Sequence, residues 1–192
     1  DINPTGFGGE LEVTIIEATG EVQRYSVPYA SVVQMLRPGM SRYAITAGEY
    51  RDRDTDLSPF IVQGKYQRGI NNYLTGYGGI QAAEKYVGIT AGAAFATPVG
   101  AIALDVTHSN AEFDTRKSES GQSYRLSYSK LVTPTNTNFT LAAYRYSTEN
   151  FYKLRDAVLV RDLENKGISS TALGKQRSEF QITLNQSFPN GW

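Results

Sequence analysis

The 192-residue sequence contains no cysteine, and its formal net charge at pH 7 is zero. Without cysteine the chain can form neither disulfide bonds nor thiolate metal sites. Its 19 basic and 19 acidic residues give no overall basic field that would attract nucleic acid, and no long acidic run predicts a disordered tail. The sequence also lacks any run of 18 or more apolar residues, so any membrane crossing requires strands rather than helices.

Residues 85–110 show a two-residue alternation of apolar and polar side chains, which is the period of a β-strand. The apolar side chains occupy odd positions up to Phe95 and even positions from Ile102 onwards. A two-residue turn at Pro98 and Val99 explains this change, because it pairs odd with even positions. The two strands then share one apolar face. The expected pairs are Phe95 with Ile102, Ala93 with Leu104 and Ala91 with Val106.

The two faces of these strands differ as an outer-membrane barrel requires. Each strand has about the 9 to 11 residues that cross a bilayer, and the 18 glycines and 13 tyrosines fit such strands, although a soluble sandwich shares this composition. The side chains expected to face lipid are Val87, Ile89, Phe95, Ile102, Leu104, Val106, Tyr124, Leu126, Tyr128, Phe180, Ile182 and Leu184. The charged side chains expected to face the lumen, as general lumen polarity or as plug contacts, are Asp105, Arg125, Arg145 and Glu179.

From residue 41 onwards the sequence predicts eight strands of a larger transmembrane antiparallel β-barrel. They are expected over residues 41–50, 59–68, 71–82, 85–97, 100–110, 121–132, 137–148 and 178–187. A turn at Ala83 and Glu84 would join the third strand to the fourth. It would place four residues of the third strand on the apolar face of the fourth: Leu74, Gly76, Gly78 and Ile80. In the first two strands the apolar face is expected to be that of Phe60, Val62 and Tyr66, with the register open.

The loop lengths predict the orientation of the strands. Connections over residues 51–58, 83–84, 111–120 and 149–177 fall at one rim, and those over residues 69–70, 98–99 and 133–136 at the other. Because barrels carry long loops outside and short turns in the periplasm, we expect the first rim to lie outside the cell.

The longest loop is expected to contain one short helix. Residues 149–164 have capping residues at Ser147 or Thr148, and Gly167 is a stop signal. The apolar positions of this helix are Phe151, Leu154 and Val158.

The first 27 residues follow a different pattern. Residues 10–27 predict a hairpin whose apolar positions alternate with dense charge, as in a water-soluble module rather than a lipid-facing one. We interpret it as the end of a β-sandwich. Residues 28–40, with the turn signal Pro38-Gly39, are expected to connect it to the first barrel strand. The chain begins and ends as if it were part of a longer protein.

Several stretches resemble one family. They are GELEVTIIEATGEVQRYSVPYASV with LRPGMSRYAITAGEYR, then YGGIQAAEKYVGITAGAA, and finally GQSYRLSYSK with AAYRYSTENFYKL. Together they are similar to the outer-membrane usher of the chaperone–usher pathway. The resemblance implies an all-β fold in which residues 1–27 are the C-terminal half of a β-sandwich plug, residues 28–40 a connector and residues 41–192 part of the transmembrane β-barrel.

The resemblance also implies a function. The expected protein is a multi-pass outer-membrane pore that would accept pilus subunits from periplasmic chaperone–subunit complexes and assemble them outward, without cofactor, metal or catalytic residues. Implied partners are these complexes and outer-membrane lipid, with no nucleic acid and a possible homo-oligomer. The helix within residues 149–164 would help to hold the plug. The helix residues expected to contact the plug are Lys153, Arg155, Asp156 and Arg161.

Other interpretations are weaker. A general porin would share the barrel but would not need the soluble hairpin. The run Asp52, Asp54 and Asp56 begins like a calcium loop, yet Leu57 stands where such a loop needs glycine, so a solvated outer loop is favoured. A barrel enzyme would need a nucleophile and base, and only His108 beside Ser109 suggests one. The glycines around Tyr77 lie within a strand, not before a helix, so they do not indicate a phosphate site.

Overall fold

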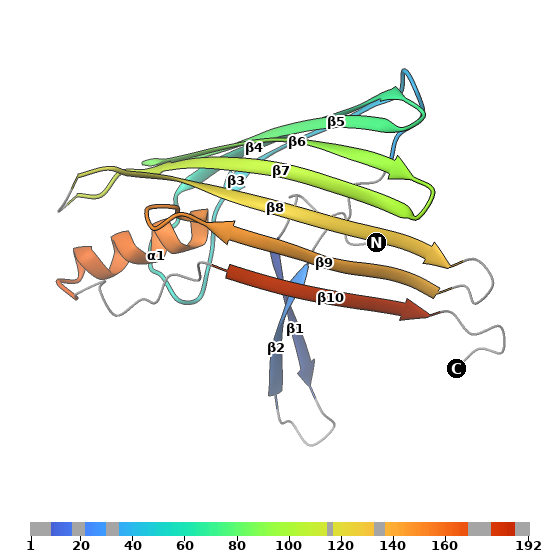
Figure 1. Ribbon diagram of the computed structural model, residues 1–192. Helices are drawn as coiled ribbons and strands as arrows, with labels where there is room; N and C mark the ends of the chain where they lie inside the picture. Colours follow the sequence, from blue (N-terminus) through green and yellow to red (C-terminus); the bar gives the residue numbers. More distant parts are fainter. Residues whose placement is uncertain are drawn as a thin grey trace.

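The computed structural model describes residues 9–16, 22–29, 35–114, 117–132, 137–168 and 178–186, with side chains described at residues 35–114, 117–130, 146–168, 178 and 180. Over these residues the chain forms strands in two sheets and one helix (Figure 1). The larger sheet is an antiparallel meander of eight strands in which each strand pairs with its neighbours in sequence. The predicted all-β fold with one helix is therefore confirmed.

The eight predicted barrel strands are all present. Their bounds are β3 Ser41–Glu49, β4 Phe60–Asn71, β5 Leu74–Ala83, β6 Tyr86–Thr97, β7 Gly100–Ala111, β8 Glu119–Val132, β9 Thr137–Ser147 and β10 Ser178–Gln186. Strands β3 and β10 are the two edges of this sheet.

The soluble hairpin consists of β1 (Gly9–Ile16) and β2 (Val22–Tyr29), which pair in a sheet of their own. Strand β2 continues through Pro28 to Tyr29, two residues into the segment expected to be the connector. The turn expected between the strands, at residues 17–20, lies outside the described residues.

The turn at Pro98 and Val99 forms as predicted. Phe95 pairs with Ile102, Ala93 with Leu104, and Ala91 with Val106. All these positions therefore lie on one face of the sheet.

Two other turns are displaced from their predicted positions. The turn expected at Ala83-Glu84 lies at Glu84-Lys85, because Ala83 still pairs with Tyr86 and Lys85 adopts a φ of 60°. The pairing between β5 and β6 is therefore shifted by two residues from the predicted one. A shift of two leaves each side chain on its predicted face, and Ile80 pairs with Ile89 on the apolar face.

The turn expected at residues 69–70 lies instead at Asn72-Tyr73. Strand β4 continues through a bulge between Gly69 and Asn71, which keeps it paired with β5. The side-chain oxygen of Asn71 then accepts a hydrogen bond from the Tyr73 N–H at 2.8 Å, an arrangement that favours a turn.

One face of the larger sheet is apolar and exposed, and we call it the apolar face. Ile89, Leu104 and Phe180 are 53%, 52% and 65% exposed. The register places on this face Val62, Tyr66 and also Tyr43, which pairs with Tyr66 and so fixes the register of β3. Positions Ile182 and Leu184 share the face by pairing with Leu141 and Phe139, although their side chains are outside those described.

Helix α1 (Leu154–Asn165) begins later than predicted. The expected caps Ser147 and Thr148 serve the sheet instead: the Ser147 hydroxyl donates to that of Ser123 at 3.1 Å, and the Thr148 hydroxyl accepts the Gln122 N–H at 2.9 Å. The helix begins after Lys153 without a side-chain cap. Gly167, with a φ of 72°, ends it as predicted.

Helix α1 lies at the end of the sheet where β9 ends and β10 begins, which we call the α1 end (Figure 1). The opposite end, with the turns at residues 72–73 and 98–99, is the connector end. In the part of the chain that the structure describes, no helix has the length and apolar character needed to cross a membrane.

Candidate functional site

The second face of the larger sheet, the polar face, is organised in rows that cross the strands. Because all strands are in register, each row consists of directly paired residues. One of them, which we call the charged row, contains Gln67, Tyr77, Gly92, Asp105, Arg125, Arg145 and Glu179. All four charged residues expected to face the lumen fall in this row.

The centre of the charged row is a buried ion pair. Arg125 donates from Nε to Asp105 Oδ2 at 2.9 Å and from its terminal nitrogen at 2.8 Å, and both side chains are 5% exposed. The Tyr77 hydroxyl donates to the same oxygen at 3.0 Å. The side chains of Arg145 and Glu179 are outside those described, so only their register positions are known.

Glycine at position 92 makes this network possible. Gly92 lies between Tyr77 and Asp105 in the row, and a Cβ there would be 2.5 Å from the Tyr77 ring and 2.6 Å from the Cβ of Asp105. The ring therefore crosses β6 in the space that any other side chain would fill. Sequence reasoning found that the glycine content fits barrel strands but did not identify this contact.

A row of hydroxyl side chains lies next to the charged row on its α1 side. The hydroxyls of Thr90 and Thr107 are 2.8 Å apart, and Ser147 bonds to Ser123. Each hydroxyl is paired with one on the neighbouring strand, so this row can stabilise the sheet while leaving a small polar surface.

Small residues also form a row under the chain that leaves β9. A Cβ on Gly121 would be 2.2 Å from the Phe151 nitrogen, and the Ser109 hydroxyl accepts the Tyr152 N–H at 3.2 Å. Gly121 pairs with Ser109, which pairs with Gly88. The chain therefore crosses the polar face over Gly121 and Ser109 before helix α1 begins, whereas the space over Gly88 is filled by the Tyr86 side chain.

Helix α1 is held at its end of the sheet by an apolar cluster. The cluster joins the helix, the crossing segment, β6, and the loop after β7, and consists of Tyr86, Ala111, Phe113, Tyr152, Leu154, Ala157, Val158 and Val160. The rings of Phe113 and Tyr152 meet edge to face with centroids 5.1 Å apart. Phe113 lies in a predicted loop and was missed. Its only signal in the sequence was an aromatic residue within an otherwise polar loop.

Ion pairs add to this attachment. Arg155 bonds to Asp52 at 2.9 Å and to Asp54 at 2.5 Å, and Lys166 bonds to Asp56 at 2.7 Å. The three aspartates expected in a solvated loop are therefore paired with cations in and just after the helix. Hydrogen bonds from the Asp54 N–H and from Arg155 hold the pKa of Asp52 below its ordinary value, and Lys166 lowers that of Asp56.

Arg161 is buried at the other side of the helix. Its Nη1 donates to the Glu84 carbonyl at 2.9 Å, and its Nη2 lies 3.8 Å from the Glu84 carboxylate. The contacts described for Arg155 and Arg161 go to loops of the α1 end. Lys153 is the residue that precedes the helix, and Asp156 lies exposed in its first turn.

The arrangement of His108 does not suit catalysis with Ser109. His108 pairs with Ile89 on the apolar face, whereas Ser109 lies on the polar face and bonds to Tyr152. Neighbours in a strand point to opposite faces, so the two side chains cannot act on one substrate. Among the described residues, no three metal-ligating side chains are grouped as a metal site requires.

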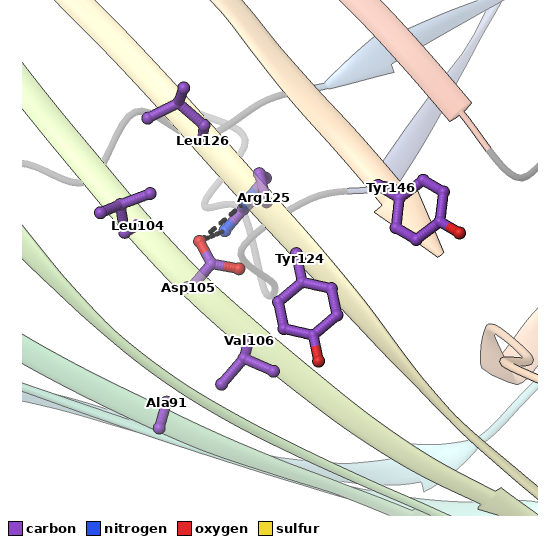
Figure 2. Close-up of a pocket in the computed structure, with 8 residues that line it drawn as sticks. All are labelled: Ala91, Leu104, Asp105, Val106, Tyr124, Arg125, Leu126 and Tyr146. Carbon is purple, nitrogen blue, oxygen red and sulfur yellow. Dashed lines mark hydrogen bonds and ion pairs between the residues drawn. The ribbon is translucent and has the colours of Figure 1, made fainter. Parts of the chain in front are cut away.

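A hollow of about 320 Å³ lies on the apolar face, and Figure 2 shows the side chains that line it. Its apolar lining comes from Ala91, Leu104, Val106, Tyr124, Leu126 and Tyr146. Asp105 and Arg125 also border it, but their side chains are paired in the charged row. The hollow is therefore a depression in the surface predicted to meet lipid, separate from the polar network.

The whole chain, residues 1–192, matches the family model described as outer membrane usher protein. The chain belongs to the outer membrane usher family. It is 43% identical over 192 residues to the usher MrkC of Klebsiella pneumoniae, covering all of this chain and 23% of MrkC. It is 40% identical to the usher HtrE of Escherichia coli, covering 97% of this chain and 22% of HtrE.

Solved usher structures share the fold. The translocation pore of the P pilus usher PapC has a TM-score of 0.73 and 29% identity, and the match covers 94% of this chain and 35% of that one. A P pilus tip assembly intermediate, PapC-PapD-PapK-PapG, matches with a TM-score of 0.62 and 27% identity, covering 98% of this chain and 23% of that chain. This usher segment spans less than a quarter of the length of the curated relatives described above. Its family membership gives the outer membrane as its location.

Substitutions on the two faces of β7 should differ in their effect on stability. Leu104→Arg would place a cation on the face predicted to meet lipid and should lower the free energy of unfolding by about 2 to 4 kcal/mol. Thr107→Arg on the polar face should cost only about 1 kcal/mol, the net value of its hydrogen bond with Thr90. Urea unfolding of a full-length usher in bilayers measures both. Equal losses would contradict the assignment of the faces.

The apolar cluster, not the ion pairs, should dominate the attachment of α1. Leu154 is 5% exposed, so Leu154→Ala should lower the opening free energy of the helix by about 2 to 5 kcal/mol. The Arg155 side chain is 46% exposed, so Arg155→Ala should cost about 1 kcal/mol or less. Hydrogen exchange of the α1 amides in a full-length usher gives both values, and the reverse order would contradict this ranking.

The Arg155 contribution should also depend on pH. The folded pKa of Asp52 is below its ordinary value, so the contribution is present above about pH 4 and is lost as the pH falls further. Exchange in Arg155→Ala compared with the parent should therefore differ at pH 6 and converge at low pH. A difference that grows on acidification would contradict this.

Proposed function

We propose that this segment forms part of the wall and gate of a pore through which the usher passes pilus subunits outward. The observation that carries the proposal is a sheet with one exposed apolar face and a polar face that chain segments cross at both ends. Such a sheet can face lipid on one side and a protein-conducting lumen on the other. A chaperone would deliver the subunits, as the PapC-PapD-PapK-PapG assembly suggests.

The proposed activity is transport and assembly without bond-breaking chemistry. Residues 1–27 would be half of a β-sandwich plug, residues 28–40 its connector and residues 41–192 the barrel wall. The charged row would present Asp105, Arg125, Arg145 and Glu179 to the plug or to passing subunits. A general porin, the second candidate, has no use for a separate soluble hairpin such as β1 and β2.

Helix α1 would help to keep the pore shut through its position. It is anchored to three loops at the α1 end, through Arg155, Arg161 and the apolar cluster. A helix fixed in this way could limit the movement of a plug behind it without a strong contact of its own. Lys153 and Asp156 are our candidates for a direct plug contact.

The loop lengths favour an orientation with the α1 end outside the cell. Single cysteines at Lys117, in the loop after β7, and at Val99, in the turn at the connector end, should differ in whole cells: an impermeant thiol reagent should label only the first. Permeabilised cells provide the control, because Val99 is 60% exposed and should react there. Labelling of the Val99 position alone in intact cells would reverse the orientation.

Removal of the helix should open the pore. Deletion of residues 150–164 from a full-length usher should raise single-channel conductance in planar bilayers and admit large antibiotics to cells, because the plug loses a restraint. Deletion of the whole plug serves as the open-pore control. Conductance that stays at the parent level after deletion of the helix, but rises after deletion of the plug, would show that the helix is not part of the gate.

A further inference from the structure

We propose that residues 35–40 anchor the connector to the polar face of the sheet and thereby restrain the plug. This inference rests on the proposed plugged pore and assigns the restraint to named residues at the connector end, opposite helix α1.

The anchor begins as an extension of the sheet. Gly39 donates to the Gly69 carbonyl and Gly69 donates to the Met40 carbonyl, both at 2.9 Å, which continues the β3–β4 ladder past Ser41. A turn then reverses the chain: the Met40 N–H bonds to the Arg37 carbonyl at 3.1 Å, and Gly39 has a φ of 79°. The residues before this turn are thus directed back over the sheet.

The reversed chain lies against small residues of the polar face. A Cβ on Gly69 would be 2.2 Å from the Arg37 carbonyl oxygen and 2.6 Å from that of Leu36. Its partner in β5, Thr75, is fully buried and accepts the Leu36 N–H at 3.0 Å. Only glycine at position 69 leaves room for this approach.

Met35 extends the contact toward the charged row. It packs against the cluster formed by Tyr77, Ala94 and Ala103. Thr75, Ala94 and Ala103 are directly paired across three strands, so they form a shallow row that a chain can cross. Tyr77 also bonds to Asp105, which links the anchor to the buried ion pair.

The anchor matters because it shortens the tether. If residues 35–40 were free, they could extend by roughly 20 Å, at about 3.3 to 3.6 Å per residue. When residues 35–40 are held on the sheet, the tether of the plug is shorter by this length. The plug then has a higher effective concentration near the lumen wall.

The test uses a full-length usher in which Met35→Cys supplies the sole reactive thiol. Gly69→Ala should displace the connector and raise the labelling rate of that thiol by about tenfold, as expected for the loss of about one net hydrogen bond. Gly48→Ala in β3 is the matched control, because a Cβ there meets nothing within 4 Å. Thr75→Val should act in the same direction as Gly69→Ala, with Thr46→Val, at an exposed position, as its control.

The second measurement is single-channel conductance without the thiol substitution. Gly69→Ala and Thr75→Val should raise the frequency of open events, and the two controls should not. Fast labelling of the Met35→Cys protein before any further substitution would overturn the proposal. Faster labelling after Gly69→Ala or Thr75→Val that is not accompanied by more open events would also overturn it. Deletion of the plug distinguishes failure of the plugged pore from failure of the anchor. If conductance is unchanged after this deletion as well, the plugged pore is rejected. If conductance rises after deletion of the plug but not after Gly69→Ala or Thr75→Val, only the anchor is rejected.

Discussion

The cross-strand register is the constraint on which the rest of this structure depends. In an antiparallel sheet one register decides at once which side chains share a face and which residues lie in one row. Here it places Ile89, Leu104 and Phe180 on the exposed face, and Asp105 opposite Arg125 on the other. A slip of one residue in either strand would turn one of these two charged side chains onto the apolar face and leave the other without its partner. An unpaired charge among apolar side chains is costly. Apolar alternation and the charged row therefore specify the same register independently.

Glycine and other small residues determine where the polar face can be crossed. Gly69 admits the connector, Gly92 admits the ring of Tyr77, and Gly121 admits the backbone at Phe151; at each position a Cβ would lie 2.2 to 2.5 Å from another atom. These three sites lie on different strands and serve different contacts, yet each replaces a side chain by a segment or a ring. Part of the glycine content of this usher segment thus serves close packing rather than flexibility.

The strands and their faces could be predicted because alternation is a local signal. The turn at Pro98 formed as predicted, whereas those near Glu84 and Asn72 moved, since parity restricts a turn only to steps of two and a bulge at Gly69 alters the count. The predicted start of α1 was wrong because the hydroxyls of Ser147 and Thr148, expected to cap the helix, form hydrogen bonds to β8 instead. The places of Phe113, Arg155 and Met35 depend on residues far away in sequence, which no local pattern contains.

A chain segment is held against the polar face at each of its two ends, and the interactions that hold the two segments differ in kind. At the α1 end, buried aromatic and aliphatic side chains dominate, so salt that screens the exposed Arg155 pairs would leave most of the attachment intact. At the connector end, a few hydrogen bonds and a close backbone approach hold the chain, each worth about 0.5 to 1.5 kcal/mol. A helix docked by an apolar cluster suits a fixed boundary. A connector held by a few hydrogen bonds, one close backbone approach and the packing of Met35 suits a restraint that can be released at moderate cost.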